Sequence, residues 1–148
     1  MNDITFENLS ARALDNMTQM KEFSRTVEDI GRNFRNLGLG MAVWHPEKIH
    51  STNLGGIDAE SYVGYSRIEG KWGLLIRTIE RDRETRNFVN QRVYWIESCG
   101  NMEIVLNGLR KTQELALLIN EVIDRQSKAL SQVGLEFEEL RNSRAQFK

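Results

Sequence analysis

The sequence predicts an α+β domain: a long N-terminal helix, a four-stranded antiparallel β-sheet (meander) and a long C-terminal helical segment, packed on one sheet face. Apolar residues recur every three or four positions near both ends of the 148-residue chain, as on one face of a helix. In the middle they follow the alternating pattern of strands. Because helices and strands are segregated along the chain, we expect the helices to form one layer over the sheet.

The N-terminal segment follows a heptad pattern that predicts one helix from about Thr5 to about Leu37. Positions a and d of the heptad, most of them large and apolar, are occupied by Phe6, Leu9, Ala13, Asn16, Met20, Phe23, Val27, Ile30, Phe34 and Leu37. Gly38 suits the left-handed position that ends many helices. Since Gly38-Leu39-Gly40 follows a helix and precedes a strand, it is interpreted as a helix end and not as a phosphate-binding loop.

The middle of the chain predicts four strands. β-branched and aromatic residues concentrate in segments 41–44, 62–68, 72–81 and 88–97. The Glu69-Gly70 pair predicts a tight hairpin between the second and third strands. The segment from Pro46 to Glu60 is expected to be the one long irregular connection, either a mobile flap or a functional loop.

The C-terminal segment predicts one long helix or two collinear helices. Apolar residues continue at alternating spacings of three and four from Met102 to Leu140. Gly108 and Gly134 weaken this helix, since glycine costs about 1 kcal/mol relative to alanine in a helix interior. We interpret residues 1–148 as a single domain, with helix in 1–38, sheet in 39–98 and helix in 100–148.

Composition argues against several classes of protein. The net charge is −1, and no segment has the basic excess typical of nucleic-acid binding, so a nucleic-acid partner is disfavoured. No stretch approaches the ~20 apolar residues of a membrane-spanning helix, and the N-terminus does not resemble a signal peptide. With Cys99 as its single cysteine, the chain forms no internal disulfide, and a cytoplasmic location is expected.

No residues have the spacing of a known catalytic or metal site. His45 and His50 match neither the HExxH pattern nor a zinc-finger arrangement, so no metal and no cofactor are expected. Cys99 precedes the final helix, where a thiol can be reactive, but the simpler role is structural. An enzyme that uses His45, His50 or Cys99 is therefore the least favoured of three functional hypotheses.

The most highly charged stretch runs from Arg77 to Arg92. Acidic residues are interleaved with its arginines, a pattern typical of a solvated hairpin with local ion pairs. A site for an anionic partner is the alternative.

Aromatic residues gather on the predicted strands, and neither face of the third strand is plainly polar. A sheet that is apolar on both faces needs two covers. The helices supply one, and the second comes from the long loop, a second subunit or a ligand. Core packing is the better single explanation of these aromatic residues. A ligand site on this sheet would use Trp44, Tyr65, Trp72, Arg77, Arg92 and Trp95.

The lengths of the two helical segments predict self-association. Helices of about 32 and about 45 residues are about 48 Å and 68 Å long, whereas four strands side by side span about 15–20 Å. Helix ends must therefore project beyond the sheet, although an antiparallel pairing of the two helices would cover part of them. The expected interface of a two-fold dimer contains Met20, Val27, Phe34, Ile123, Leu130, Val133, Phe137 and Leu140.

Two functional hypotheses are favoured over an enzyme. The first is a non-enzymatic interaction or assembly protein that forms a homodimer through its terminal helices and presents the sheet and the 46–60 segment to a protein partner. The alternative is a protein that binds or sequesters a small ligand, such as an anionic metabolite or a nucleotide, on the aromatic sheet face.

Overall fold

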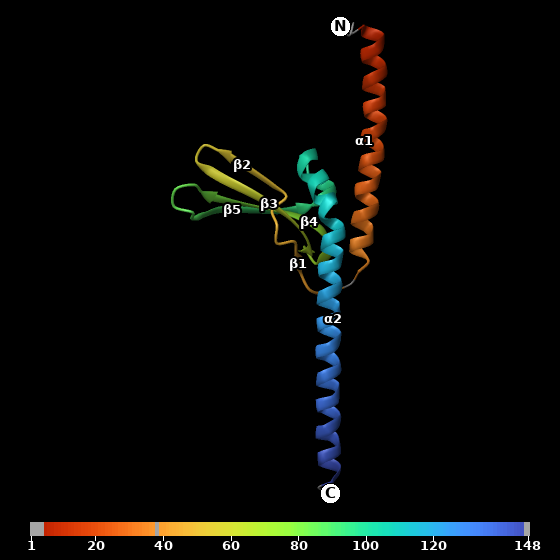
Figure 1. Ribbon diagram of the computed structural model, residues 1–148, viewed down its shortest axis with the longest axis vertical. Coiled ribbons are helices and arrows are strands. Elements are labelled where there is room, and N and C mark those ends of the chain that lie inside the picture. The colour runs from red at the N-terminus through yellow and green to blue at the C-terminus, as the bar shows by residue number, and fades with distance from the viewer. Residues whose placement is uncertain (1–4, 38, 147–148) are drawn as a thin grey trace.

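The computed structural model describes residues 5–37 and 39–146 and confirms the α+β class: an antiparallel sheet with two long helices that lie side by side next to it (Figure 1). Its elements in chain order are α1 (Phe6–Arg35), β1 (Val43–Trp44), β2 (His50–Leu54), β3 (Ile57–Ile68), β4 (Lys71–Asp82), β5 (Phe88–Trp95), the 3-10 helix η1 (Ile96–Ser98) and α2 (Met102–Gln146).

Helix α1 begins where the sequence predicts and ends slightly earlier. The side chain of Thr5 accepts a hydrogen bond from the backbone N–H of Asn8 at 3.2 Å, which satisfies a donor of the first turn. At the other end, the N–H of Asn36 still donates to the carbonyl of Arg32 at 3.3 Å. The role assigned to Gly38 lies outside the described residues.

The sheet has five strands, so the prediction of four strands is wrong. The additional strand, β2, lies within the Pro46 to Glu60 segment, which was expected to be a long irregular connection. Leu54 pairs with Ile57, and Gly55 and Gly56 form the two-residue turn between them with φ angles of 59° and 77°. Such positive φ angles are accessible to glycine at little cost, and Gly-Gly is a known hairpin signal.

The strands form an antiparallel meander in the order β1-β3-β4-β5, and β2 also pairs with β3. Strands β3 and β4 pair without interruption from Ile57 and Asp82 to Ile68 and Lys71. The predicted hairpin at Glu69-Gly70 is confirmed, with φ angles of 51° and 81°. In Figure 1 the turn between β2 and β3 and the turn between β4 and β5 lie at the end of the sheet that points away from both helices.

Helix α2 is one continuous helix of 45 residues, which decides between the two alternatives for this segment. Its first part joins the core on one sheet face, where Val105 and Leu115 are buried in the same cluster as Val63 and Ile76. Gly108 permits this close approach, because a Cβ atom there would lie 3.3 Å from the Ile76 side chain. The residue predicted to weaken the helix thus lets it pack on the sheet.

Helix α1 packs against β4 and η1, beside α2. The carboxylate of Glu97 in η1 lies directly against Gly31, where a side chain would collide with it. The same carboxylate forms an ion pair with Arg35 at 3.2 Å, one turn further along α1. These contacts attach the second half of α1 to the sheet, and within residues 5–37 and 39–146 the first half of α1 has no comparable neighbour.

Candidate functional site

The two helices run in the same direction and overlap along only part of their lengths (Figure 1). Phe23 and Val27 line a hollow together with Met102 and Val105, whereas Phe34, further along α1, lines a groove with residues 116–123 of α2. Positions further along α1 therefore face positions further along α2. An antiparallel pair within one chain, which the sequence left open, does not form.

This stagger leaves two projecting segments, one beyond each end of the overlap. We call residues 6–20 the α1 arm and residues 121–146 the α2 arm; their lengths are about 22 Å and 39 Å at 1.5 Å per residue. The sheet, η1 and the overlapping parts of the helices are the body. In Figure 1 the α1 arm leads to the N end and the α2 arm to the C end of the longest axis.

Both arms carry large apolar side chains in solvent. The exposed ones on the α1 arm are Phe6, Leu9, Leu14, Met17 and Met20. Those on the α2 arm are Ile123, Leu130, Val133, Leu135, Phe137 and Leu140. Phe6 is 83% exposed and Phe137 62%, so these rings are covered neither by their own helix nor by the body. Monomeric proteins rarely expose continuous apolar surface of this extent.

The eight residues predicted to form a dimer interface fall into three groups. Val27 and Phe34 are buried within the body of their own chain. Met20 and Ile123 lie where the arms leave the body, and Leu130, Val133, Phe137 and Leu140 are exposed on the α2 arm. The heptad pattern thus continues from the core into solvent without a change in composition.

The residues predicted to bind a ligand do not form one site. The register of the sheet places Trp44, Arg77 and Trp95 on the face away from α2. Tyr65, Trp72 and Arg92 lie on the opposite face, where the Tyr65 and Trp72 rings stack at 5.4 Å between centroids. Any ligand site must therefore use one of these groups or other residues.

The sheet face away from α2 is covered by side chains of the same chain. A Cβ atom at Gly64 would lie 2.3 Å from the Trp44 ring, so the ring lies flat on the backbone at that glycine. Trp95 lies in the same way over Gly73, with a corresponding distance of 2.5 Å. Leu75, which pairs with Trp95, is fully buried. Two tryptophans thus supply a cover that the sequence analysis assigned to a loop, a subunit or a ligand.

Arginines lie on these two rings. The Arg77 guanidinium carbon is 4.3 Å from the Trp44 ring centroid, and that of Arg35 is 5.2 Å from the Trp95 centroid. Such cation–π contacts stabilise the layer by about 0.5–1 kcal/mol each at exposed sites.

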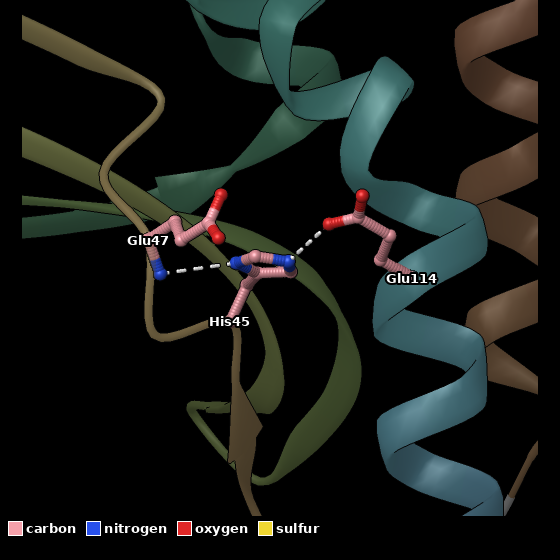
Figure 2. A group of neighbouring side chains, drawn as sticks. All are labelled: His45, Glu47 and Glu114. Atoms are coloured by element: carbon pink, nitrogen blue, oxygen red, sulfur yellow. Dashed lines mark hydrogen bonds and ion pairs between the residues drawn. The ribbon is translucent and has the colours of Figure 1, made fainter.

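A cluster of ionisable side chains joins the sheet to α2 (Figure 2). One ring nitrogen of the buried His45, Nε2, lies 2.7 Å from Glu114 Oε2. The other, Nδ1, accepts a hydrogen bond from the backbone N–H of Glu47 at 3.1 Å. The Lys111 ammonium bridges Glu47 at 2.9 Å and Glu114 at 3.3 Å.

The three possible ligand atoms of His45, Glu47 and Glu114 lie within 4.8 Å of one another, but their hydrogen bonds do not suit a metal ion. Since Nδ1 accepts from a backbone N–H, the ring proton is on Nε2 and points at Glu114. Nε2 therefore has no free lone pair for a cation, and the Lys111 charge already lies between the carboxylates. The arrangement instead links β1 to α2.

Hydrogen bonds account for the electrostatics of this cluster. The bond from His45, followed by the bond from Lys111, lowers the pKa of Glu114 below its ordinary value. The hydrogen bonds to Glu47 and then to Glu114 raise the pKa of Lys111. Both effects favour the charged forms, so the cluster is fully formed at neutral pH.

The charged stretch from Arg77 to Arg92 forms strand ends and a hairpin tip. Arg86 pairs with Asp58 of β3 at 2.9 Å, and Arg92 pairs with Glu80 of β4 at 2.9 Å. Hydrogen bonds from the backbone and side chain of Thr85 lower the pKa of Asp82, which begins the turn. Local ion pairs thus hold Arg86 and Arg92, whereas Arg77 lies over the Trp44 ring.

The remaining catalytic candidates, His50 and Cys99, line one cavity. It has a volume of about 390 Å³ and lies between β2–β5 and the start of α2. Tyr94, Ser61 and Thr78 also line it, and the sequence analysis did not single out these three. A polar residue at an inward position of a strand was the available signal, since Ser61 and Thr78 alternate with core residues.

The chain matches no protein-family model, and no curated protein or solved structure is significantly similar to it. None of the helices within residues 5–37 and 39–146 is both long enough and apolar enough to cross a membrane.

Proposed function

We propose that the protein is a non-enzymatic assembly protein that dimerises through its arms and presents the sheet to a protein partner. The observation that carries this proposal is the exposure of the heptad positions on both arms, continuous with heptad positions that are buried in the body. The cytoplasm is the location we propose, because the chain carries a single cysteine.

The occupant that best fits the arms is a second copy of the chain. The arms project from opposite ends of two helices that run in the same direction. A two-fold axis perpendicular to these helices therefore places the α1 arm of each protomer antiparallel to the α2 arm of the other, which gives two equivalent contacts. One symmetry operation thus covers all four arms.

The apolar pattern and the charges support this antiparallel pairing. Alternating a and d layers place Leu9 of one arm opposite Phe137 of the other, and Ala13 opposite Val133. Arg12 and Glu136 both occupy position g of their heptads, beside these layers, and antiparallel helices bring the two g positions to the same side. Their opposite charges favour this alignment.

A groove beside the α2 arm extends the surface that pairing would cover. It has a volume of about 270 Å³ and lies between the end of α1, at Phe34, and α2, at Ala116 and Ile119. Ile123, at its edge, begins the apolar stripe of the α2 arm. The proposed contact therefore runs from the arm tips to the body.

The mass in solution tests this proposal. By light scattering we expect twice the chain mass of 17.2 kDa for the full chain. Leu130→Glu places a charge in the apolar layer and is expected to give the monomer mass. Ser131→Glu, which adds the same charge one position away on the exposed arm, should leave the dimer intact. A monomer mass for the full chain, or equal effects of the two variants, would overturn the proposal.

A further inference from the structure

The cavity between the sheet and the start of α2 is a second feature with the chemistry of a binding site. It is lined by residues of four strands and by residues 98–101 and Ile104. It lies on the body and away from both arms, so its function does not depend on dimerisation. At about 390 Å³ it falls within the size range of small-molecule sites.

Three hydroxyl groups form a hydrogen-bonded row on one wall. Ser61 Oγ lies 2.8 Å from Thr78 Oγ1, which lies 3.4 Å from the Tyr94 hydroxyl oxygen. Three hydroxyls carry three protons, and two contacts use only two of them. The third proton, on whichever hydroxyl donates in neither contact, needs an acceptor outside the row.

Tyr94 is the end of the row that can offer this proton to a ligand. Its only other hydrogen-bonding neighbour among the described residues is the Cys99 thiol, which donates to the phenol oxygen at 3.8 Å and therefore does not take the phenol proton. Burial, the largest effect, raises the pKa of Tyr94, so the phenol keeps its proton at neutral pH. The Cys99 thiol has a second acceptor in the Asn101 carbonyl, at 3.6 Å.

The start of α2 supplies a further donor. Asn101 Oδ1 accepts from the N–H of Ile104 at 3.2 Å, and the Asn101 carbonyl accepts from the N–H of Val105 at 3.1 Å. The side chain of Asn101, which lines the cavity, also carries an amide N–H₂ group that can donate a hydrogen bond. This group and the helix dipole favour a negative charge at this end.

The ionisable side chains with nitrogen that line the cavity belong to basic residues. Arg92 and His50 line it, and none of the described residues that line it is a carboxylate. Glu80 pairs with Arg92 at 2.9 Å from outside this lining, so it holds the guanidinium in place and partly neutralises it. In a chain with 21 acidic residues, a cavity that combines these donors with no acidic group in its lining favours anions.

We propose that this cavity binds a small molecule through an oxyanion, either a carboxylate or a phosphate group. Tyr94 and Arg92 donate to the oxyanion from the sheet, and the side-chain amide of Asn101 donates from the start of α2. The predicted alternative of an anionic ligand thus moves from the aromatic face to the face that packs on α2, and of the six residues predicted for it only Arg92 lines the cavity.

The test is an NMR titration of the full chain with inorganic phosphate and, separately, with succinate, each against sodium chloride at equal ionic strength. We expect saturable shifts of the Asn101 side-chain amide signals with at least one of the two anions. Saturation by phosphate alone indicates a phosphoryl ligand, and by succinate alone a carboxylate ligand. Shifts that follow ionic strength without saturating would overturn the proposal.

Matched variants localise the effect. Arg92→Gln should weaken binding about tenfold or more, the expected loss of a charge-assisted hydrogen bond. Arg86→Gln removes an equally exposed arginine, also paired at 2.9 Å but outside the cavity, and should change nothing. Tyr94→Phe should weaken binding, whereas Tyr62→Phe, on the opposite face, should not. Equal losses within either pair would contradict the assignment.

Discussion

The body and the arms have the same heptad pattern but opposite surroundings. Ile119 and Leu140 both occupy position d on α2, yet Ile119 is 3% exposed and Leu140 61%. The difference comes from what lies opposite: the sheet and α1 cover Ile119, and the described part of the chain offers nothing to Leu140. Periodicity therefore identifies the apolar face of a helix, but it does not identify what covers that face.

The largest expected difference between the body and the arms is in the stability lost when an apolar side chain is removed. Ile119→Ala should lower the free energy of unfolding of the body by about 2–5 kcal/mol at every protein concentration. Leu140→Ala should have almost no effect in dilute, monomeric protein. Urea unfolding followed by tryptophan fluorescence measures this, because Trp44, Trp72 and Trp95 all lie in the sheet. Equal losses would mean that the arm is part of the folded core.

Glycine replacements should have opposite signs in the two regions. Gly64→Ala forces a methyl group into the Trp44 ring and should cost about 1–3 kcal/mol of stability. At Gly134, on the α2 arm, the added methyl group meets no atom within 4 Å, and alanine should stabilise the helix by about 1 kcal/mol. Thermal unfolding monitored by circular dichroism compares them. A loss of helix in Gly134→Ala would contradict a solvated arm.

These contrasts also show what the sequence could reveal. The α+β order, both helices and the Glu69-Gly70 hairpin follow from local periodicity and turn chemistry, and the structure confirms them. Strand β2, with the sequence HSTNL, was missed because it is polar and four of its five residues are exposed. The adjacent Gly-Gly pair was the only local signal of this strand.

The candidate sites were harder to predict because they depend on long-range pairing. The Tyr94 hydroxyl meets Thr78 only through the register of β4 and β5, and it approaches Cys99 only because η1 turns the chain back. His45 meets Glu114 across 69 positions of sequence. The covering of Leu75 by Trp44 and Trp95 likewise depends on the pairing of Trp44 with Gly64 and of Trp95 with Leu75, and local patterns do not contain that information.

A charge exchange between the arms tests the proposed alignment with a smaller effect. Arg12→Glu and Glu136→Arg should each weaken dimerisation, and the double variant should restore it. An exposed ion pair contributes about 0.2–1 kcal/mol, and the two-fold dimer contains two such pairs. Sedimentation equilibrium measures the dissociation constants. Additive losses in the double variant would reject a contact between these positions.

The smallest expected effect is the loss of stability at low pH from the ionisable cluster that contains His45, Lys111 and Glu114. The pKa of Glu114 is lowered in the folded state, so this group contributes stability above its ordinary value of 4.5, and the contribution disappears as the pH falls through the lower folded value. The stability difference between the native chain and Glu114→Gln should therefore shrink between pH 6 and pH 3. Glu121→Gln, at an exposed position of the same helix, is the control. A pH-independent difference would contradict the linkage.

Intermolecular disulfide formation tests most directly whether the arms cover each other. In a Cys99→Ser background, chains with Leu9→Cys are mixed with chains with Phe137→Cys and oxidised at low protein concentration. The account predicts a covalent dimer in the mixture and little in either variant alone, because each cysteine faces the other position of the partner. Cross-linking of Phe137→Cys with itself, or no cross-linking in the mixture, would contradict the antiparallel pairing of the α1 and α2 arms.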